Sequence, residues 1–188
     1  MNVYDFDNTI YDGESVVDFY LFCARKKPSL IKYFPLMLHM LVKYKLGLIS
    51  ISELENKAAK YALIIFSSID SSKKAISEFW DKNEYKIKDF YKGQQREDDI
   101  IISASCSFLL YEICRRLGIK NLICSEIDLS SGKINQVCFR SNKPLILKKL
   151  FPNIDLENFY TDSKNDMPMI EIAKNAYLVK KNKITKIK

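Results

Sequence analysis

Two aspartates stand at the end of a short apolar segment near the start of the chain. Asp5 and Asp7 follow Val3 and Tyr4, and Thr9 comes soon after. An apolar run that ends in carboxylates is typical of a buried strand in an open α/β sheet, where ligands bind at the carboxyl ends of the strands. Side chains alternate along a strand, so both acids start on one face. Two acids this close repel, so we expect a cation between them, and Mg²⁺ prefers hard oxygen ligands.

The rest of the chain divides into a helical block and an alternating block. Residues 14–95 have helical periodicity, with expected helices at 16–26, at 36–47, from Ser50 or Ser52, and after residues 70–72. From residue 100 onward, strands are expected at 100–102, 122–124, 159–161 and 176–179, helices at 108–117, 144–151 and 169–173, and a hairpin from 126–129 to 134–139. Such alternation predicts a parallel sheet with right-handed crossovers. The expected fold is therefore α/β: a Rossmann-like parallel sheet core (1–13 and 96–188) with a helical cap (14–95) inserted after the first strand.

Composition and charge argue against several other classes of function. The 188 residues carry a net charge of +7, and their lysines are spread along the chain, so we expect no nucleic-acid role. The five cysteines include no Cys-x-x-Cys, and the single His39 cannot complete a usual zinc site. A single histidine also argues against Ser-His-Asp or Cys-His catalysis, unless His39 itself serves. The apolar stretch 30–49 is broken by charges and Pro35, which argues against a membrane span. With a strand beginning almost at Met1, no signal peptide is expected, so we predict a cytoplasmic protein.

Four segments in order give the chain a family resemblance. They are Asp5-Phe6-Asp7-Asn8-Thr9, the strand and hydroxyl at 100–105, Lys143 before Pro144, and the acid pair in 160–169. Together they resemble the motifs of the haloacid dehalogenase-like phosphohydrolases, and they span almost the whole chain. The resemblance implies a Mg²⁺-dependent phosphatase acting through an aspartyl-phosphate.

The resemblance also implies residue roles. Asp5 would be the nucleophile, Asp7 the general acid/base and Thr9 the residue that orients the acid. Ser103 and Ala104 would contact the phosphoryl group, with Ser105 and Ser107 as alternatives to Ser103. Lys143 would neutralise phosphate charge, with Lys148 and Lys149 as weaker candidates. Asp5, Asp7, Asp162 and Asp166 would form the metal site, Asp166 through water or by orienting Lys143, and Asn165 would shape that loop.

The substrate is less sharply indicated. Glu14 matches a residue that contacts the amino group in the phosphoserine phosphatase branch of subclass IB. No arginine lies between Arg25 and Arg96 to bind a substrate carboxylate. The second and fourth motifs look more like phosphatidylglycerophosphatase C-type members. The apolar cap residues Leu36, Leu38, Met40 and Leu41, with Lys43, would suit a lipid-like or glycerol-based phosphomonoester and a peripheral membrane contact, or would simply form the core of the cap.

Other functions remain open at this point. A phosphoserine phosphatase-type enzyme acting on a small phosphorylated metabolite is the nearest alternative. A receiver-like phospho-acceptor also uses acids, a hydroxyl, a lysine and Mg²⁺, but it carries its phosphorylated aspartate in mid-chain. A non-catalytic binding protein would not need all four chemical positions to be filled.

Overall fold

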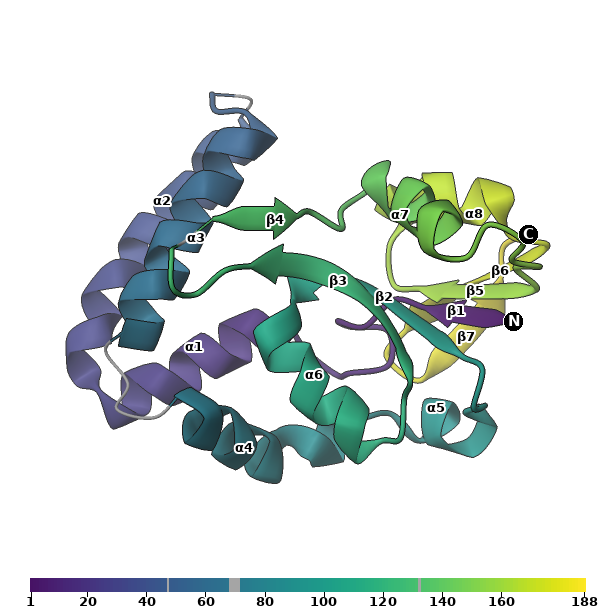
Figure 1. Cartoon of the computed structure of the whole chain (residues 1–188), viewed down its shortest axis with the longest axis horizontal. Coiled ribbons are helices and arrows are strands. Elements are labelled where there is room, and N and C mark those ends of the chain that lie inside the picture. The colour runs from purple at the N-terminus through teal and green to yellow at the C-terminus, as the bar shows by residue number, and fades with distance from the viewer. Residues whose placement is uncertain (47, 68–71, 132) are drawn as a thin grey trace.

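A twisted, mostly parallel sheet forms the centre of the molecule (Figure 1). In the computed structural model, which describes residues 1–46, 48–67, 72–131 and 133–188, its strand order is β4-β3-β2-β1-β5-β6-β7. The strands are β1 (Asn2–Tyr4), β2 (Ile100–Cys106), β3 (Asn121–Ile127), β4 (Ile134–Gln136), β5 (Asn158–Thr161), β6 (Asn175–Lys180) and β7 (Lys183–Lys186). Strand β1 pairs in parallel with both β2 and β5, so the acidic segment leaves the middle of the sheet.

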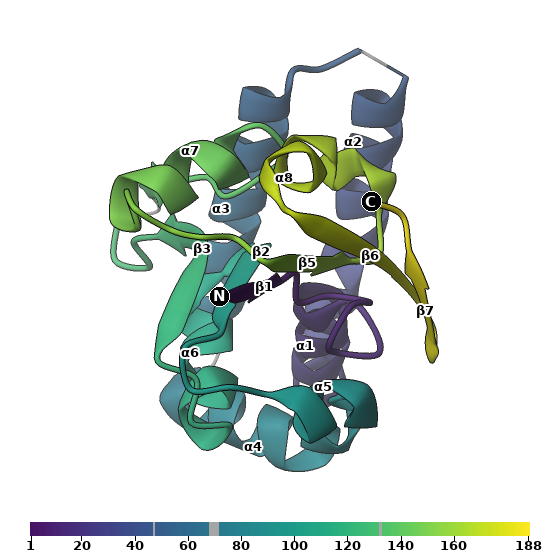
Figure 2. The same ribbon diagram turned by 90° about the vertical axis from the view of Figure 1, so that its right-hand side faces the viewer.

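The helices cover both faces of the sheet and also extend beyond it. They are α1 (Ser15–Lys26), η1 (Pro28–Tyr33), α2 (Phe34–Lys45), α3 (Ile51–Ser67), α4 (Ser72–Asn83), η2 (Glu84–Lys86), α5 (Asp89–Gln94), α6 (Ser107–Arg116), α7 (Asn142–Leu150), η3 (Lys164–Asp166) and α8 (Met167–Ile172). Helices α7 and α8 lie on one face, and α4, α5 and α6 lie below the other (Figure 2). Helices α2 and α3 form an antiparallel pair at the outer edge of the molecule.

The two faces of the sheet bury separate apolar clusters, as the alternation of side chains requires. Val3, Ile100 and Phe159 pack with residues of α7 and α8. Their neighbours Tyr4 and Ile101 pack on the opposite side, with residues of α1, α4 and α6. The sheet is therefore covered on both faces, which is the usual condition for parallel strands.

The α/β fold with helices inserted after the first strand is confirmed. The hairpin is present as β3 and β4, which are antiparallel, although β3 starts at Asn121 and is longer than expected. Helix α3 begins after Ser50, whose Oγ accepts a hydrogen bond from the Glu53 amide. Residues 70 and 71, expected to precede the fourth helix, lie outside the described residues.

The C-terminal segment adds a strand beyond the one expected at 176–179. The chain turns at Lys181, which has a φ of 53°, and β7 pairs antiparallel with β6. The four residues of β7 are all exposed, so the strand adds backbone hydrogen bonds with little apolar burial. An apolar pattern could not predict it.

The helical insertion leaves and re-enters the core at adjacent points. The Asp12 amide donates to the Lys86 carbonyl oxygen (2.9 Å), and the Lys88 amide donates to the Ile10 carbonyl oxygen (2.8 Å). Tyr11 and Ile87 form a bridge between these two segments. We call residues 10–12 and 86–88 the neck. It begins only a few residues after Asp5 and Asp7.

Helix α4 packs against the core as well as against α1. Phe79 and Trp80 are fully buried, and the Trp80 indole N–H donates to the Leu109 carbonyl oxygen of α6 (2.8 Å). No helix in the described part of the chain has both the length and the apolar character needed to cross a bilayer.

Candidate active site

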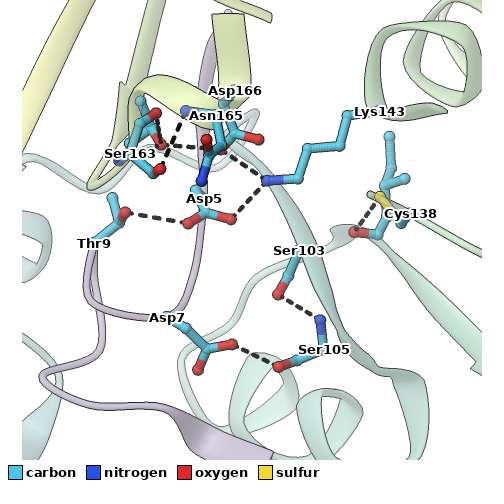
Figure 3. Close-up of polar contacts among 12 residues, drawn as sticks. Asp5, Asp7, Thr9, Ser103, Ser105, Cys138, Lys143, Ser163, Asn165 and Asp166 are labelled. Atoms are coloured by element: carbon cyan, nitrogen blue, oxygen red, sulfur yellow. Dashed lines mark hydrogen bonds and ion pairs between the residues drawn. The ribbon is translucent and has the colours of Figure 1, made fainter. Parts of the chain in front are cut away.

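Asp5 lies just past the end of β1 and shares a buried lysine with Asp166 (Figure 3). Lys143 Nζ is 2.9 Å from Asp5 Oδ1 and 2.9 Å from Asp166 Oδ2. The lysine side chain is 4% exposed, and the two carboxylates are 11% and 8% exposed. One cation therefore faces two acids in a site of low dielectric. Burial raises the pKa of Asp5 to about 7, with Asp166 adding to the rise and Lys143 opposing it.

A tight turn after Asp5 fixes its orientation. The Asp5 amide donates to the Tyr160 carbonyl oxygen (2.9 Å), which extends the β1–β5 ladder by one residue. The chain then folds back, and the amides of Thr9 and the two residues after it donate to the Phe6 carbonyl oxygen. Thr9 is fully buried, and its hydroxyl donates to Asp5 Oδ2 (3.3 Å). Asn8 adopts a positive φ of 57°, which asparagine tolerates better than most residues.

Asp7 is held by a hydroxyl and a main-chain amide. The Ser105 hydroxyl donates to Asp7 Oδ2, and the Ser15 amide at the start of α1 donates to Asp7 Oδ1 (2.6 Å). The helix N-terminus favours the charged form of the acid. Burial nevertheless raises the pKa of Asp7, and the hydrogen bonds from Ser105 and Ser15 oppose that rise.

Ser103 and Ser105 occupy different positions at the irregular end of β2. The register with β3 shifts between Ile102 and Cys106, so these serines lie in a bulged segment. Ser103 Oγ accepts from the Ser105 amide (3.1 Å). Ala104 between them is exposed. The strand expected at 100–102 is longer than predicted, because β2 continues past Ser103 to Cys106, and α6 then starts at Ser107.

Lys143 occupies the first turn of α7, with its side chain directed at Asp5. Lys148 and Lys149 lie in the last turn of the same helix and are exposed. Of these three lysines, Lys143 is the one whose Nζ contacts Asp5.

The loop after β5 carries the second acid pair. Asp166 Oδ2 accepts from the buried Thr161 hydroxyl (2.9 Å) in addition to Lys143. Asp162 is half-buried, which raises its pKa, while Lys180 opposes the rise. Asn165 is exposed, and its amide donates to Ser163 Oγ (3.1 Å), which shapes the turn. Thr161 thus fixes Asp166.

Glu14 and Lys88 flank the acidic loop. Glu14 is exposed and accepts from Asn8 Nδ2 (2.6 Å). Partial loss of solvent around the carboxylate raises the pKa of Glu14, and the negative charges of Asp7 and Asp162 raise it further. Lys88 is buried, its Nζ donates to the Asn8 carbonyl oxygen (2.5 Å), and burial lowers its pKa. Sequence reasoning missed Lys88, because a lysine in a helical block has no distinguishing signal.

Three of the acids expected to hold a metal ion share one electrostatic property. Asp5, Asp7 and Asp162 bring hard carboxylate oxygens, and burial raises the pKa of each. A bound cation would relieve that cost. No group of three or more His, Cys, Asp or Glu residues at metal-binding spacing occurs in the described residues. Mg²⁺ in phosphoryl-transfer sites is commonly held by one or two carboxylates, waters and the substrate phosphate.

Comparison with known proteins settles the family. The model of haloacid dehalogenase-like hydrolases matches residues 3–171. The chain belongs to this family. No curated protein matches its sequence significantly.

Solved structures share the fold at low sequence identity. A protein of unknown function from Bordetella pertussis Tohama I is 19% identical, with a TM-score of 0.75, over 94% of this chain and 87% of that one. A phosphoserine phosphohydrolase-like protein from Francisella tularensis subsp. tularensis SCHU S4 is 20% identical, with a TM-score of 0.57, over 93% and 84%. A phosphoserine phosphatase with a phospho-aspartyl intermediate analogue is 15% identical, with a TM-score of 0.55, over 93% and 83%. These likenesses support the fold of this family member.

Proposed function

We propose that this hydrolase cleaves phosphomonoesters through an aspartyl-phosphate formed on Asp5. The observation that carries the proposal is the placement of Asp5. Its carboxylate lies at the carboxyl end of the central strand and is fixed by Lys143 and Thr9. Asp7 lies two residues further on, held by Ser105. A positioned nucleophile beside a positioned proton carrier is the arrangement that two-step phosphoryl transfer needs.

The chemistry balances with these two acids. A carboxylate oxygen of Asp5 forms a bond to phosphorus as the bond to the leaving alkoxide breaks, and protonated Asp7 gives its proton to that alkoxide. A water then attacks phosphorus, Asp7 takes a proton from it, and the bond from phosphorus to Asp5 breaks, releasing phosphate. The raised pKa of Asp7 suits its first role, since more of it is protonated near neutral pH.

Lys143 and Mg²⁺ would neutralise the transferred group. We propose that Asp5, Asp7 and Asp162 hold the ion, with Asp166 acting on the site through Lys143, whose Nζ it contacts at 2.9 Å. The ion would offset negative charge on the phosphoryl oxygens. Ser103 and Ala104, on the bulged end of β2, would contact the same oxygens.

The direct test is the Asp5→Asn variant. It keeps the shape of the side chain and removes the attacking charge, so turnover of a generic aryl phosphate should fall below detection while the fold remains. Asp12→Asn is the matched control, because Asp12 is exposed at the neck. Wild-type protein quenched in acid after incubation with ³²P-labelled substrate should carry a label that hydroxylamine releases, as expected for an acyl phosphate. If Asp5→Asn kept more than a few per cent of wild-type turnover, Asp5 would not be the nucleophile.

We propose that residues 14–95 act as a cap over a core made of 1–13 and 96–188. The neck supports the start of the insertion after residue 13, but it brings the chain back to the core at residues 86–88, before the expected end at residue 95. The described cysteines are all free thiols, which suits a reducing, cytoplasmic setting.

For the substrate we propose a phosphomonoester with an apolar or glycerol-based body. Glu14 is exposed and could meet an amino group, but no arginine lies between Arg25 and Arg96 to bind a carboxylate. Leu36 and Leu38 are exposed, whereas Met40 is buried in the cap, so the cap does not use all its apolar residues internally. Leu41 belongs to the same set, but its side chain is not among those that the structure describes. Lys43 is half-buried.

A side-by-side assay decides the substrate class. An unpaired carboxylate costs about 1.5–3 kcal/mol, which predicts a kcat/KM for phosphoserine about one to two powers of ten below that for a phosphatidylglycerophosphate-like ester. A clear preference for phosphoserine would instead favour a small-metabolite phosphatase, with Glu14 as the ligand of the amino group.

A further inference from the structure

An apolar surface on the outside of α2 and at its two ends is largely exposed. We call it the α2 face and define it by Ile31, Phe34, Leu38, Val42 and Leu46. From Phe34 onward these residues recur every four positions, which places them along one side of the helix. Between 44% and 68% of each side chain is exposed. Phe34 also stacks on Tyr20, with ring centroids 6.2 Å apart, so the face begins where α2 meets α1.

The opposite side of α2 is already used for folding. Met40 is buried, and Tyr33 and Met37 pack against the main apolar cluster. Helix α2 is therefore apolar on both its inner and its outer side, whereas a surface helix normally presents polar residues to water. Figures 1 and 2 show α2 and α3 side by side at the edge of the molecule that lies away from the N- and C-termini. We therefore expect the outer side of α2 to contact a partner outside the described part of the chain.

The stretch of sequence that contains the α2 face carries charge of one sign. From residue 19 to residue 52 the chain contains no aspartate or glutamate, although it has 23 acids in total. The same stretch contains Arg25, Lys26, Lys27, Lys32, Lys43 and Lys45. Of these, Lys26 pairs with Glu78 of α4. Lys32 is exposed beside the first residues of the face, and its Nζ lies over the Tyr33 ring.

We propose that the α2 face binds the surface of a membrane rich in anionic lipids. Phe34, Leu38 and Val42 would enter the boundary between headgroups and acyl chains, while the basic residues contact lipid phosphates. A helix with an exposed apolar side and basic flanks lies in the plane of the interface. Each lysine or arginine near an anionic leaflet adds to the attraction within a Debye length.

The same charges disfavour a second copy of this chain as the occupant. A two-fold interface would bring each α2 face against its own copy. Two acid-free, basic segments would then face each other, and like charges at an interface are costly. An anionic lipid surface supplies the opposite charge.

The test is sedimentation of the whole protein with vesicles. Vesicles of phosphatidylcholine and phosphatidylserine should bind it, and vesicles of phosphatidylcholine alone should bind it at least about tenfold less well. Raising the salt concentration should weaken binding further, because surface charge is screened. Equal binding to both vesicle types, or binding to neither, overturns the proposal. The assay measures binding without turnover, so its outcome is separate from that of the proposed phosphatase activity.

Paired variants separate the apolar and basic contributions. Leu38→Gln with Val42→Gln should reduce vesicle binding at least about tenfold, since two apolar side chains no longer enter the interface. Lys32→Glu with Lys43→Glu should reduce it by a similar factor. The replaced residues are exposed or half-buried, so the fold should tolerate both pairs, and circular dichroism checks this.

Helix α7 offers matched controls. Leu145→Gln with Leu150→Gln, and Lys148→Glu with Lys149→Glu, make the same changes at exposed positions on the other side of the sheet. Both control pairs should bind vesicles like the wild type. A loss of binding equal to that of the α2 pairs would mean that general charge or hydrophobicity is responsible. A concentration-dependent dimer that the α2 pairs dissociate would make a second copy the occupant. Either result rejects the proposal.

Discussion

Lys143→Met is expected to destabilise the fold strongly when no metal is bound. The lysine is almost fully buried between Asp5 and Asp166, with 2.9 Å contacts to both. Methionine has a similar length, so the change removes the charge and leaves little void. Two buried carboxylates would then face each other without a cation. Removing one partner of a buried pair typically costs about 3–5 kcal/mol. In a domain of this size, that lowers Tm by about 10 °C.

The size of this loss should depend on pH in a defined direction. Without Lys143, which opposes the rise, the pKa of Asp5 in the folded protein lies well above the unfolded value of about 3.9. When a group has a higher pKa in the folded than in the unfolded protein, its contribution to stability is fully present below the unfolded pKa. That contribution is lost as the pH rises through the folded pKa. The deficit of Lys143→Met relative to wild type should therefore be small near pH 4 and should grow up to about pH 8. Even with Lys143 present, the pKa of Asp5 is about 7.

Urea unfolding with EDTA, at several pH values, measures this deficit. Lys149→Met is the matched control, since it makes the same change at an exposed position of the same helix and should cost little. Adding Asp5→Asn to Lys143→Met should recover part of the loss, because only the Asp166 carboxylate then remains. A deficit below about 1 kcal/mol at pH 8, or one that does not change with pH, would refute the account of a lysine neutralising two acids.

Three further predictions concern activity. Ser105→Ala should lower kcat about 10- to 100-fold, since a hydrogen bond to a charged group contributes about 1.5–3 kcal/mol. The variant should also shift the alkaline limb of the pH–rate profile to higher pH, because losing this hydrogen bond raises the pKa of Asp7. An alkaline limb at the wild-type pH would show that Ser105 does not set the pKa of Asp7. EDTA should abolish turnover, Mg²⁺ should restore it and Ca²⁺ should restore it poorly, whereas full activity in EDTA would exclude a metal role. Lys88→Met should lower kcat by freeing the loop at Asn8, while the exposed Lys92→Met should not; equal kcat values would show that Lys88 does not position the loop.

The sequence predicted the charged centre of the site better than the groups around it. Asp5 could be chosen because it follows a recognisable strand, and Lys143 and Asp166 because they match motifs of the family that the sequence resembles. The structure brings all three into contact. Ser105 was weighed only as an alternative to Ser103, because a regular strand pattern cannot show a bulge that turns one hydroxyl toward Asp7.

Other features lacked a sequence signal for identifiable physical reasons. Lys88 acts through a main-chain carbonyl oxygen brought near by the neck, and such a contact between distant segments leaves no local pattern. Strand β7 is held by its backbone, so its exposed side chains do not alternate. On α2 the apolar residues were visible in the sequence. Whether Leu38 belonged to the core or to the surface depended on how α2 packs, and only the fold decides that.

The neck makes the helical insertion a closed loop. Hydrogen bonds join residues 10–12 to residues 86–88, so the two ends of the insertion are held together next to the sheet. Closing a longer loop costs little, about 0.6 kcal/mol for each doubling of its length. Helices α2 and α3 can therefore be shortened, lengthened or exchanged for those of another family member at small cost to the core, provided that Phe79 and Trp80 of α4 stay. The architecture lets new specificities evolve by grafting, while Asp5 and Lys143 keep their places.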